Sequence, residues 1–560
     1  MRLSIIIIAL AGLTLVHYAD SQDLPPYRKP KHYPNRHRAN AVKSAFQVSW
    51  DGYYQYAFPH DSLRPVNNTY EDDRNGWGAS AVDAFSTALI MGNGKVVSQI
   101  LEYIPTINFN QTDTQVSLFE TTIRYLGGLL SAYDLITGPL HGNSSSVKVS
   151  AILKQAKRLA DNLKVAFYTP SGIPDNQLNF NPPRRVGSST NGIATIGTLV
   201  LEWTRLSDLT GDPEYALLAQ RAEEYLLQPR PALGEPFPGL LGTNVDIDTG
   251  LFVDGSGGWG AGDDSFYEYL IKMYLYDPTR FKRYSERWVK AADSSIRYLV
   301  SHPTSRPDLT FLAMWENRTL NFVSQHLACF SAGNFILGGL TLDEPSYVRF
   351  GLDLVDGCYA TYSSTLTGIG PEIFRWQDDS LPLNASYNKP PPANQTGFYE
   401  TAGFWITNAG YVLRPEVIES YYYAYRATGN PLYQEWAWEA FTAINATCRI
   451  GSGYSSIKNV NKVNGGGFAD FQESFWFAEV LKYSYLIFAE DAAWQVQADH
   501  SNEFVFNTEA HPIRIYGGRK GGRGRKRGGG GWERGGWGES FKGREQRAEN
   551  WTRRRGWGRG

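Results

Sequence analysis

A helical spacing of apolar residues is the feature that most restricts the fold. From about Val42 to Phe488, apolar and aromatic residues recur three and four positions apart, and few stretches alternate as strands do. Prolines placed to open a helix follow a helix-stopping or capping residue at five points: Thr137-Gly-Pro139, Gly211-Asp-Pro213, Tyr276-Asp-Pro278, Asp343-Glu-Pro345 and Gly429-Asn-Pro431. The prolines are 74, 65, 67 and 86 positions apart, which suits a pair of helices with its loops. We therefore predict about seven helical hairpins.

We expect these hairpins to close into a ring that forms one domain over residues 41–515. Closure would let roughly 450 helical residues fold without exposed end repeats. The sequence shows no polar terminal cap, and the candidate inner helices carry a Gly-Gly pair and aromatic residues that suit a crowded centre. An open solenoid and an ordinary helical bundle are the alternatives.

Residues 1–21 have the form of a secretory signal peptide, and we assign 22–40 to an N-terminal extension. An apolar run from Ile5 to Val16 precedes the small-residue site Ala19-Asp-Ser21. The run is too short for a comfortable membrane span, and no later stretch approaches about 20 consecutive apolar residues. We expect a soluble protein of the secretory pathway, either secreted or in the Golgi or ER lumen, with no stable membrane span. A signal anchor is the alternative.

Sequons and cysteines agree with export. The Asn-X-Ser/Thr sites that we expect to be glycosylated are Asn67, Asn110, Asn143, Asn317, Asn384, Asn394 and Asn445. Three cysteines in 560 residues make no disulfide scaffold, but an exported chain can hold one bridge. We predict that Cys329 pairs with Cys358, because both fall in neighbouring predicted helices, and that Cys448 is free and buried.

The net charge of −2 hides a basic tail. From Gly517 onward, 14 Lys and Arg face 4 Asp and Glu, a net charge of +10, so the rest of the chain carries −12. Residues 516–560 are dominated by Gly and Arg, cannot bury enough apolar surface to fold alone and are predicted to be disordered. Their functional interpretation is polyanion or nucleic-acid binding. A dispensable extension or a mistranslated gene end is the alternative.

Three segments place a carboxylate where a helix begins and then becomes apolar or aromatic. They carry Glu120 with Arg124, Asp264, and Glu416 with Arg414. Glu120 and Arg124 are one helical turn apart and share a face. Because burying either of them unpaired is costly, they must satisfy each other or face a polar cavity.

Each carboxylate also has a structural explanation. Ser117 and Glu120 fit a capping box, Asp263 or Asp264 could cap a helix, and Glu416 could complement a helix dipole. Caps do not require adjoining arginines or several acids in aromatic surroundings, so the set favours a site. In a helical ring, alternate helix N-termini collect at one end, which would bring the three segments together. Carboxylates that converge on an aromatic-lined cavity suit glycoside hydrolysis, in which one stays protonated and another ionised.

Seven segments in order resemble the class I α-1,2-mannosidases, glycoside hydrolase family 47, above all the fungal secreted and Golgi-type members. They cover nearly all of residues 40–515 and are Gly76-Trp-Gly-Ala-Ser-Ala-Val-Asp83, Ser117–Leu130, Asp264-Ser-Phe-Tyr-Glu-Tyr-Leu270, His326-Leu-Ala-Cys-Phe330, Leu413-Arg-Pro-Glu-Val-Ile-Glu419, Glu473-Ser-Phe-Trp-Phe-Ala-Glu479 and Phe506-Asn-Thr-Glu-Ala-His-Pro512. The resemblance implies an all-α (α/α)7 barrel and an inverting mechanism. It gives Glu120 the role of general acid acting through a water, Glu416 that of general base, and Asp264 that of a third essential carboxylate.

The resemblance also implies a Ca²⁺ ion at the barrel base that contacts the sugar hydroxyls. Thr508 would bind the ion through its hydroxyl and carbonyl oxygens, which are hard ligands that suit Ca²⁺, although by itself Asn-Thr-Glu is more often a turn. The resemblance assigns substrate binding to Arg124, Arg414, Phe475, Glu479 and Glu509. It also implies that three carboxylates contact the ion through waters: Glu419, Glu479 and Glu509. The family's single disulfide matches Cys329 with Cys358.

Two positions depart from the family pattern. Ser86 replaces the usual Asp in Asp83-Ala-Phe-Ser-Thr87 and puts a local hydrogen bond in doubt. Gly262 stands where members that remove one particular mannose carry Arg, and a small residue there resembles members that trim several α-1,2-linked mannoses. The Gly/Arg tail has no counterpart.

We predict a Ca²⁺-dependent, inverting exo-α-1,2-mannosidase that trims high-mannose N-glycans, on glycoproteins or as free oligosaccharides, from Man9GlcNAc2 towards Man5GlcNAc2. We expect a monomer whose folded domain has no nucleic-acid partner. The main alternative is a catalytically silent glycan-binding protein on the same barrel, used in glycoprotein quality control, although the three carboxylates speak against it. A third hypothesis makes the basic tail the functional part.

Overall fold

The computed structural model describes residues 30–141, 146–229 and 234–517. The predicted signal peptide, the sequon at Asn143 and the tail from residue 518 onward lie outside these residues. Within them, no helix is long and apolar enough to cross a membrane.

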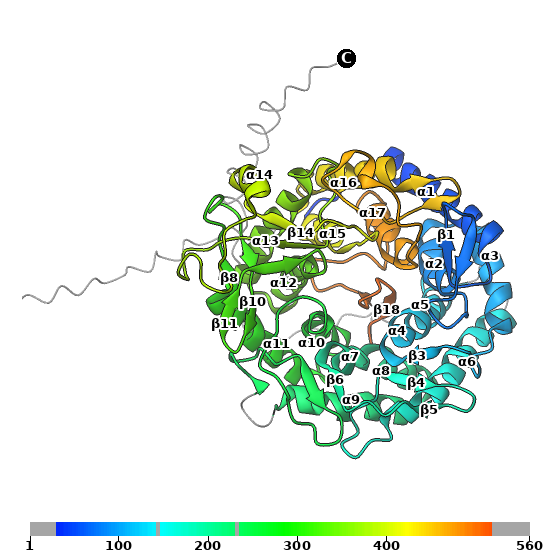
Figure 1. Cartoon of the computed structure of the whole chain (residues 1–560). Helices are drawn as coiled ribbons and strands as arrows, with labels where there is room; N and C mark the ends of the chain where they lie inside the picture. The colour runs from blue at the N-terminus through cyan, green and yellow to red at the C-terminus, as the bar shows by residue number, and fades with distance from the viewer. Residues whose placement is uncertain (1–29, 142–145, 230–233, 518–560) are drawn as a thin grey trace, which may run out of the picture. The chain divides into compact units, whose positions relative to one another are not determined.

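Two concentric rings of helices dominate the described chain (Figure 1). The inner ring contains α2 (Ala79–Met91), α5 (Gly127–Thr137), α8 (Val200–Thr210), α10 (Asp264–Tyr276), α12 (Phe330–Leu342), α15 (Glu416–Thr428) and α17 (Leu481–Leu486). The outer ring contains α1 (Arg36–Tyr56), α3 (Gly94–Tyr103), α6 (Ser146–Leu163), α9 (Glu214–Leu227), α11 (Lys282–Ser294), α13 (Pro345–Ser363) and α16 (Leu432–Cys448). Inner helices have neighbours on all sides, and every residue of α2 is buried, whereas outer helices such as α11 keep a polar face.

The ring is closed by the two ends of the folded chain. Six inner helices pack against the outer helix that follows them, and α17 packs against α1 to make the seventh pair. Next to this pair, the Asn35 N–H donates to the Phe488 carbonyl at 2.8 Å. The predicted (α/α)7 barrel is confirmed, and the open solenoid is wrong because no inner helix is left at a free end of the ring.

The predicted helix starts are confirmed at three of the five prolines. Pro345 is the first residue of α13, and Pro213 and Pro431 directly precede α9 and α16. The prediction is wrong at Pro278, because the Asp277 carboxylate accepts the N–H groups that follow and forms a turn, so α11 begins only at Lys282. At Pro139, α5 ends in a turn, and α6 begins at Ser146.

Short antiparallel strands fill the connections between helices. They are β1 (Ser62–Arg64), β2 (Thr69–Glu71), β3 (Gln115–Ser117), β4 (Gln177–Asn179), β5 (Arg184–Arg185), β6 (Thr190–Gly192), β7 (Asn244–Asp246), β8 (Val300–Ser301), β9 (Phe311–Leu312), β10 (Met314–Glu316), β11 (Thr319–Asn321), β12 (Val323–Gln325), β13 (Ile373–Arg375), β14 (Trp405–Asn408), β15 (Arg449–Ile450), β16 (Gly453–Tyr454), β17 (Phe504–Phe506) and β18 (Pro512–Arg514). They pair as two-stranded sheets or, for β3–β4–β5 and β12–β13–β14, as three-stranded sheets, with Phe374 opposite both Ser324 and Ile406. The short helices α4 (Leu118–Glu120), α7 (Ile193–Gly197) and α14 (Thr396–Ala402) also lie in connections.

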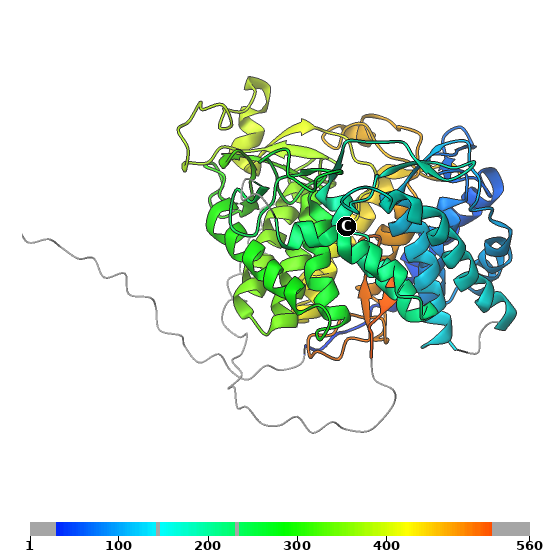
Figure 2. The ribbon, with the colours of Figure 1, turned by 90° about the horizontal axis from the view of Figure 1, so that it is seen from below.

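One hairpin closes an end of the barrel. Figure 2 shows the orange hairpin β17–β18 at one end and the yellow-green strand β14 at the other. Phe504, Val505 and Phe506 are all buried, so β17 is a plug and not an exposed edge. The turn between its strands carries Thr508 and Glu509. The residues proposed to hold an ion are therefore fixed at the barrel base.

The cysteine predictions are confirmed. Cys329 and Cys358 form a disulfide that links the turn before α12 to α13, and Cys448 is free and buried. Among the sequons, Asn67, Asn110, Asn317, Asn384 and Asn394 are exposed. Asn445 is half-buried, and its side-chain oxygen accepts a hydrogen bond from the Tyr454 hydroxyl at 2.6 Å.

Candidate active site

A cavity of about 330 Å³ lies among the inner helices and contains every predicted catalytic, substrate-binding and metal-binding residue. Its walls include Glu120, Arg124, Asp264, Arg414, Glu416, Phe475, Glu479, Thr508 and Glu509. These residues come from five separate segments of the chain. The ring brings them together, as the expected gathering of helix N-termini requires.

The three carboxylates stand at helix starts. Asp264 and Glu416 are the first residues of α10 and α15, and Glu120 ends the single turn α4. The capping-box explanation is half right, since the Ser117 hydroxyl accepts the Glu120 N–H at 3.2 Å, but the Glu120 carboxylate turns towards Arg124. Asp263 precedes α10 but makes no side-chain capping bond. Side-chain capping therefore does not account for the carboxylates of Glu120 and Asp263, whereas Glu416, as the first residue of α15, also lies where it complements the helix dipole.

Arg124 joins two of the acidic groups. Its Nε donates to Glu120 Oε2 at 2.8 Å, and its Nη1 donates to Glu509. The Arg74 Nε lies 3.5 Å from Glu120 Oε2. Burial opposes ionisation of Glu120, but the charges of Arg124 and Arg74 outweigh it and lower the pKa of this carboxyl. Glu120 is therefore ionised at neutral pH.

Asp264 has the opposite environment. Burial is the main reason why its pKa rises to about 7, and the charges of Glu268 and Glu416 add to this effect. The Ser265 N–H, 2.9 Å from Asp264 Oδ1, opposes the rise only in part. At neutral pH, Asp264 thus holds its proton for a substantial part of the time.

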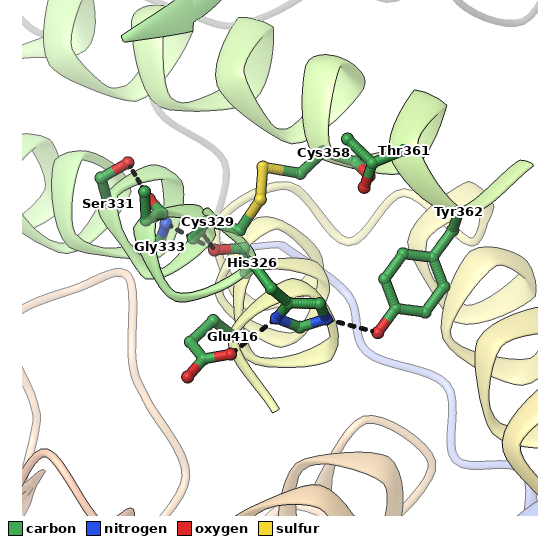
Figure 3. Close-up of a disulfide and its surroundings, with 10 residues drawn as sticks. His326, Cys329, Ser331, Gly333, Cys358, Thr361, Tyr362 and Glu416 are labelled. Carbon is green, nitrogen blue, oxygen red and sulfur yellow. Dashed lines mark hydrogen bonds and ion pairs between the residues drawn. A yellow bond between two sulfur atoms is a disulfide. The ribbon is translucent and has the colours of Figure 1, made fainter. Parts of the chain in front are cut away.

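Glu416 is held ionised by a histidine. His326 Nδ1 lies 2.7 Å from Glu416 Oε2, as Figure 3 shows. Burial favours the neutral acid, but the hydrogen bond from His326 and the charge of Arg414 lower the pKa of Glu416. Arg414 itself donates to Glu372 Oε2 at 2.6 Å. His326 lies in one of the segments that carry the family resemblance. The sequence alone does not assign it a role, because its partner Glu416 is 90 residues away.

Acidic groups also crowd the base of the cavity around Thr508. Burial raises the pKa values of Glu419, Glu479 and Glu509 well above the usual range, and the negative charges of other carboxylates raise them further. The Thr508 N–H donates to the Tyr269 hydroxyl at 3.2 Å. Burial and mutual repulsion therefore favour the protonated forms of these carboxyls. A cation bound among them would lower their pKa values and restore their negative charge.

The turn that carries Thr508 is locked by Asn507. The Asn507 side-chain oxygen accepts the N–H groups of Glu509 and His511 at 3.0 and 2.8 Å. Its amide nitrogen donates to the Ile123 carbonyl and to Glu202. Each of these contacts fixes the backbone around Thr508, so the position of its hydroxyl and carbonyl oxygens is set by the barrel.

Ser86, which departs from the family pattern, is hydrogen-bonded in the structure. The Ser86 hydroxyl lies 2.9 Å from His511 Nδ1, and His511 Nε2 lies 3.3 Å from Asp83. Serine at this position therefore makes a buried hydrogen bond of its own, to the imidazole of His511.

Two π turns lie in the walls of the cavity, and neither is predictable from the sequence. Residues Thr121–Leu126 and Trp476–Val480 form π turns, which carry Arg124 and Glu479. A π turn inserts an extra residue into a helix and redirects the side chains beside it, and such turns occur frequently at functional sites. No residue type marks a π turn, so periodicity could not reveal it.

Known proteins share this arrangement. The family model described as glycosyl hydrolase family 47 matches residues 45–515. The mannosyl-oligosaccharide α-1,2-mannosidase 1B of Aspergillus phoenicis is 55% identical over 516 residues, which are 92% of this chain and 98% of that protein. The mannosyl-oligosaccharide α-1,2-mannosidase of Penicillium citrinum is 55% identical over 510 residues, 91% of this chain and 98% of that protein.

A solved structure agrees with these relatives. The α-1,2-mannosidase from Trichoderma reesei superposes with a TM-score of 0.84 at 55% identity and covers 86% of this chain and 100% of that one. The match extends over the barrel that builds the cavity. Because the family model spans most of the chain and relatives of this similarity cover nearly their whole length, the chain belongs to glycosyl hydrolase family 47, a family of glycosidases.

Proposed function

We propose that this protein is an inverting, Ca²⁺-dependent exo-α-1,2-mannosidase that trims terminal mannose from high-mannose N-glycans, from Man9GlcNAc2 towards Man5GlcNAc2. The observation that carries the proposal is one cavity with three carboxyls at helix starts, of which Glu120 and Glu416 have lowered pKa values and Asp264 has a pKa raised to about 7. Inverting glycosidases need an ionised base and a protonated acid in the same site. The names of the relatives supply the sugar and the linkage.

Glu416 is the proposed base. Its lowered pKa leaves a free carboxylate able to take a proton from a water molecule, which then attacks the anomeric carbon from the face opposite the leaving oxygen. The hydrogen bond from His326 leaves the second carboxylate oxygen for that water. Arg414, which also lines the cavity, supports the ionised form.

The proton for the leaving oxygen comes from the other side of the cavity. The family resemblance gives this role to Glu120 acting through a water. Of the three carboxyls at helix starts, Asp264 is the one whose raised pKa keeps a proton near neutral pH, so we assign the stored proton to Asp264 and the orientation of the relaying water to ionised Glu120. These two functions explain why the Glu120 carboxylate, which orients the water, is paired with arginines, whereas the Asp264 carboxyl, which stores the proton, is not.

The residues at the base fit a hard cation. Thr508 offers a hydroxyl and a carbonyl oxygen, and Glu419, Glu479 and Glu509 surround it with negative charge. Within residues 30–141, 146–229 and 234–517, no three His, Cys, Asp or Glu side chains lie close enough to bind a metal directly. The carboxylates would therefore act through waters. A bound Ca²⁺ would supply positive charge at the sugar hydroxyls.

We assign the inner end of this cavity to a single terminal mannose. The β17–β18 hairpin closes one end of the barrel, and Arg124 lies 5.6 Å from the centre of the Phe475 ring. Gly262 also lines the cavity, and its φ of +97° is a backbone conformation that side chains rarely adopt, so no side chain narrows the cavity there. A closed base supports removal of terminal residues, and the lack of a side chain at Gly262 supports removal of several in succession.

Incubation with α-1,2-mannobiose, with and without a chelator, tests the proposal. We expect free mannose only without chelator, and proton NMR should show β-mannose as the first product, because inversion changes the α configuration. Tight sugar binding without release would favour the glycan-binding alternative. We also propose that the protein works as a monomer in the secretory pathway, which gel filtration and an assay of the culture medium would test.

A further inference from the structure

We propose that Tyr362 is a positioning residue for the reaction: through His326 it sets the tautomer of the imidazole and so fixes the orientation and charge of Glu416. The inference rests on the proposed role of Glu416 as base. None of the motifs that carry the family resemblance contains Tyr362.

The three side chains form a buried chain of hydrogen bonds. The Tyr362 hydroxyl lies 2.7 Å from His326 Nε2, and His326 Nδ1 lies 2.7 Å from Glu416 Oε2 (Figure 3). His326 is 2% and Tyr362 3% exposed, so water does not substitute for either partner. Both imidazole nitrogens therefore depend on these two groups for their hydrogen bonds.

Chemistry fixes the direction of these bonds. An ionised carboxylate only accepts hydrogen bonds, so Nδ1 must carry the proton that Glu416 receives. In a neutral imidazole Nε2 is then an acceptor, and Tyr362 must donate to it. Burial raises the pKa of Tyr362 well above its usual range, so the phenol keeps the proton that it donates. The phenol thereby selects the tautomer that supports the base.

Loss of the Tyr362 hydroxyl removes that selection. With no donor at Nε2, the imidazole proton can move to Nε2, and Nδ1 would then turn a lone pair towards an ionised carboxylate. Glu416 would lose the hydrogen bond that lowers its pKa, because His326 is the largest cause acting against burial. The carboxylate would also lose its only described contact with the imidazole and become free to rotate away from the attacking water.

The disulfide supports the same arrangement. Cys329 follows His326 by three residues, and Cys358 precedes Tyr362 by one helical turn on α13. The bridge therefore ties together the two backbone segments that carry the histidine and the tyrosine, and Figure 3 shows it beside them. On the other side, the His326 N–H donates to the Glu372 carbonyl at 3.0 Å. Both backbones are held, so the side chains have little freedom to compensate.

Other polar groups face the same pocket. The Tyr411 ring lies 5.7 Å from the His326 ring, and the Tyr411 hydroxyl donates to the Arg414 carbonyl at 3.0 Å. The carboxylates of Glu416 and Glu372 and the Cys448 thiol also raise the pKa of Tyr362. A test must therefore remove only the phenol oxygen and leave the remaining charges in place.

Tyr362→Phe makes this change and keeps the ring. We expect kcat to fall by about 10- to 100-fold with little change in KM, since loss of a tautomer-fixing partner impairs the chemical step. The acidic limb of the kcat profile should move to higher pH, because Glu416 becomes easier to protonate. Tyr347→Phe is the matched control: Tyr347 is on the same helix, is buried, and donates to Asp293 at 2.6 Å away from the cavity.

The nitrogen-15 NMR signals of labelled histidine provide an independent measurement. In the wild-type protein the His326 ring should be protonated at Nδ1 only, and in Tyr362→Phe the proton should shift towards Nε2. If Tyr362→Phe matches Tyr347→Phe in kcat and in the acidic limb, the proposal is wrong. If the variant does not fold, the wild-type spectrum decides, and an Nε2-protonated or doubly protonated ring at neutral pH overturns the proposal.

Failure of the proposed function gives a different result. If Glu416→Gln keeps normal turnover, Glu416 is not the base, whatever the imidazole spectrum shows. If Glu416→Gln is inactive while Tyr362→Phe retains full activity and an unchanged acidic limb, the base assignment survives and only the role of Tyr362 is rejected.

Discussion

Arg124 and Glu120 form a hydrogen-bonded ion pair across one helical turn, with Arg124 Nε 2.8 Å from Glu120 Oε2 in the wall of the cavity. The side chain of Glu120 is 31% exposed and that of Arg124 only 6%, so the arginine lies behind the carboxylate. Arg124 also pairs with Glu509 at the barrel base. One guanidinium thus links the carboxylate proposed to orient a water to the residues proposed to surround the ion.

Arg124→Ala should therefore damage both stability and activity. Removing it leaves the buried carboxyl of Glu509 without its hydrogen-bond partner, and loss of a hydrogen bond to a charged group costs about 1.5–3 kcal/mol. Urea unfolding measures this loss. Arg283→Ala is the control, since Arg283 and Glu224 form an exposed pair that should contribute less than about 1 kcal/mol. Equal effects of the two substitutions would contradict the linking role.

Glu416→Gln should abolish turnover and preserve sugar binding. The amide keeps the shape of the side chain but cannot take a proton from water, so kcat should fall by at least about 10²- to 10⁴-fold. Calorimetric titration with a mannose disaccharide measures binding in the same preparation. Glu400→Gln, at an exposed position of α14, should behave as wild type. Near-normal turnover of Glu416→Gln would refute the assignment of the base.

The outline of the fold followed from local sequence, because helical periodicity and capping residues act over a few positions. The inner helices were recognisable from Gly127-Gly128 in α5 and from the aromatic residues of α15. The closing pair was harder to predict, since α1 and α17 are separated by most of the chain. The helix start predicted at Pro278 was wrong, because the Asp277 carboxylate accepts the Thr279 N–H and forms a turn before α11.

The site was predictable in part, because the residues that mark a helix start also lie within a few positions of one another. Helix starts identified the carboxylates, and their meeting followed once a ring was assumed. The partners of Glu416 were not predictable, because His326 and Tyr362 are 90 and 54 residues away from it, and neither residue type signals its contact. Arg74 was also missed, since it lies in a loop and reaches Glu120 only through the tertiary fold. Long-range contacts of single side chains leave no local pattern.

The protonation of Asp264 predicts an alkaline limit to activity. Its pKa is raised to about 7, so as pH rises through this value the acid loses its proton and kcat should fall. The lowered pKa of Glu416 places the acidic limit below the usual range of a glutamate, where the base becomes protonated. A plot of kcat against pH should be bell-shaped. Asp264→Asn should remove the alkaline limb together with most of the activity; a variant that keeps this limb would show that another group holds the proton.

Opening the disulfide should reduce activity more than it disturbs the helices. The bridge closes a loop with a sequence separation of 29 and ties His326 to the helix of Tyr362. Removing a native disulfide costs about 2–5 kcal/mol, and here we also expect the imidazole to lose its fixed position. Cys329→Ala should therefore lower kcat at temperatures where circular dichroism still shows a folded barrel. Cys358→Ala opens the same bridge from its other end and should give the same loss; a normal kcat in either variant would contradict the expectation.

Removal of the proposed ion should be visible in stability as well as in activity. A cation that binds only the folded barrel raises the melting temperature further as its concentration exceeds its Kd, so Ca²⁺ should raise Tm and a chelator should reverse the gain. Thr508→Ala removes the hydroxyl ligand and should abolish most of the Ca²⁺-dependent part of Tm. Thr401→Ala, at an exposed position of α14, should keep the full increase. Because Thr508 is fixed by the turn around Asn507, a Ca²⁺ response that persists in Thr508→Ala would place the ion elsewhere in the protein.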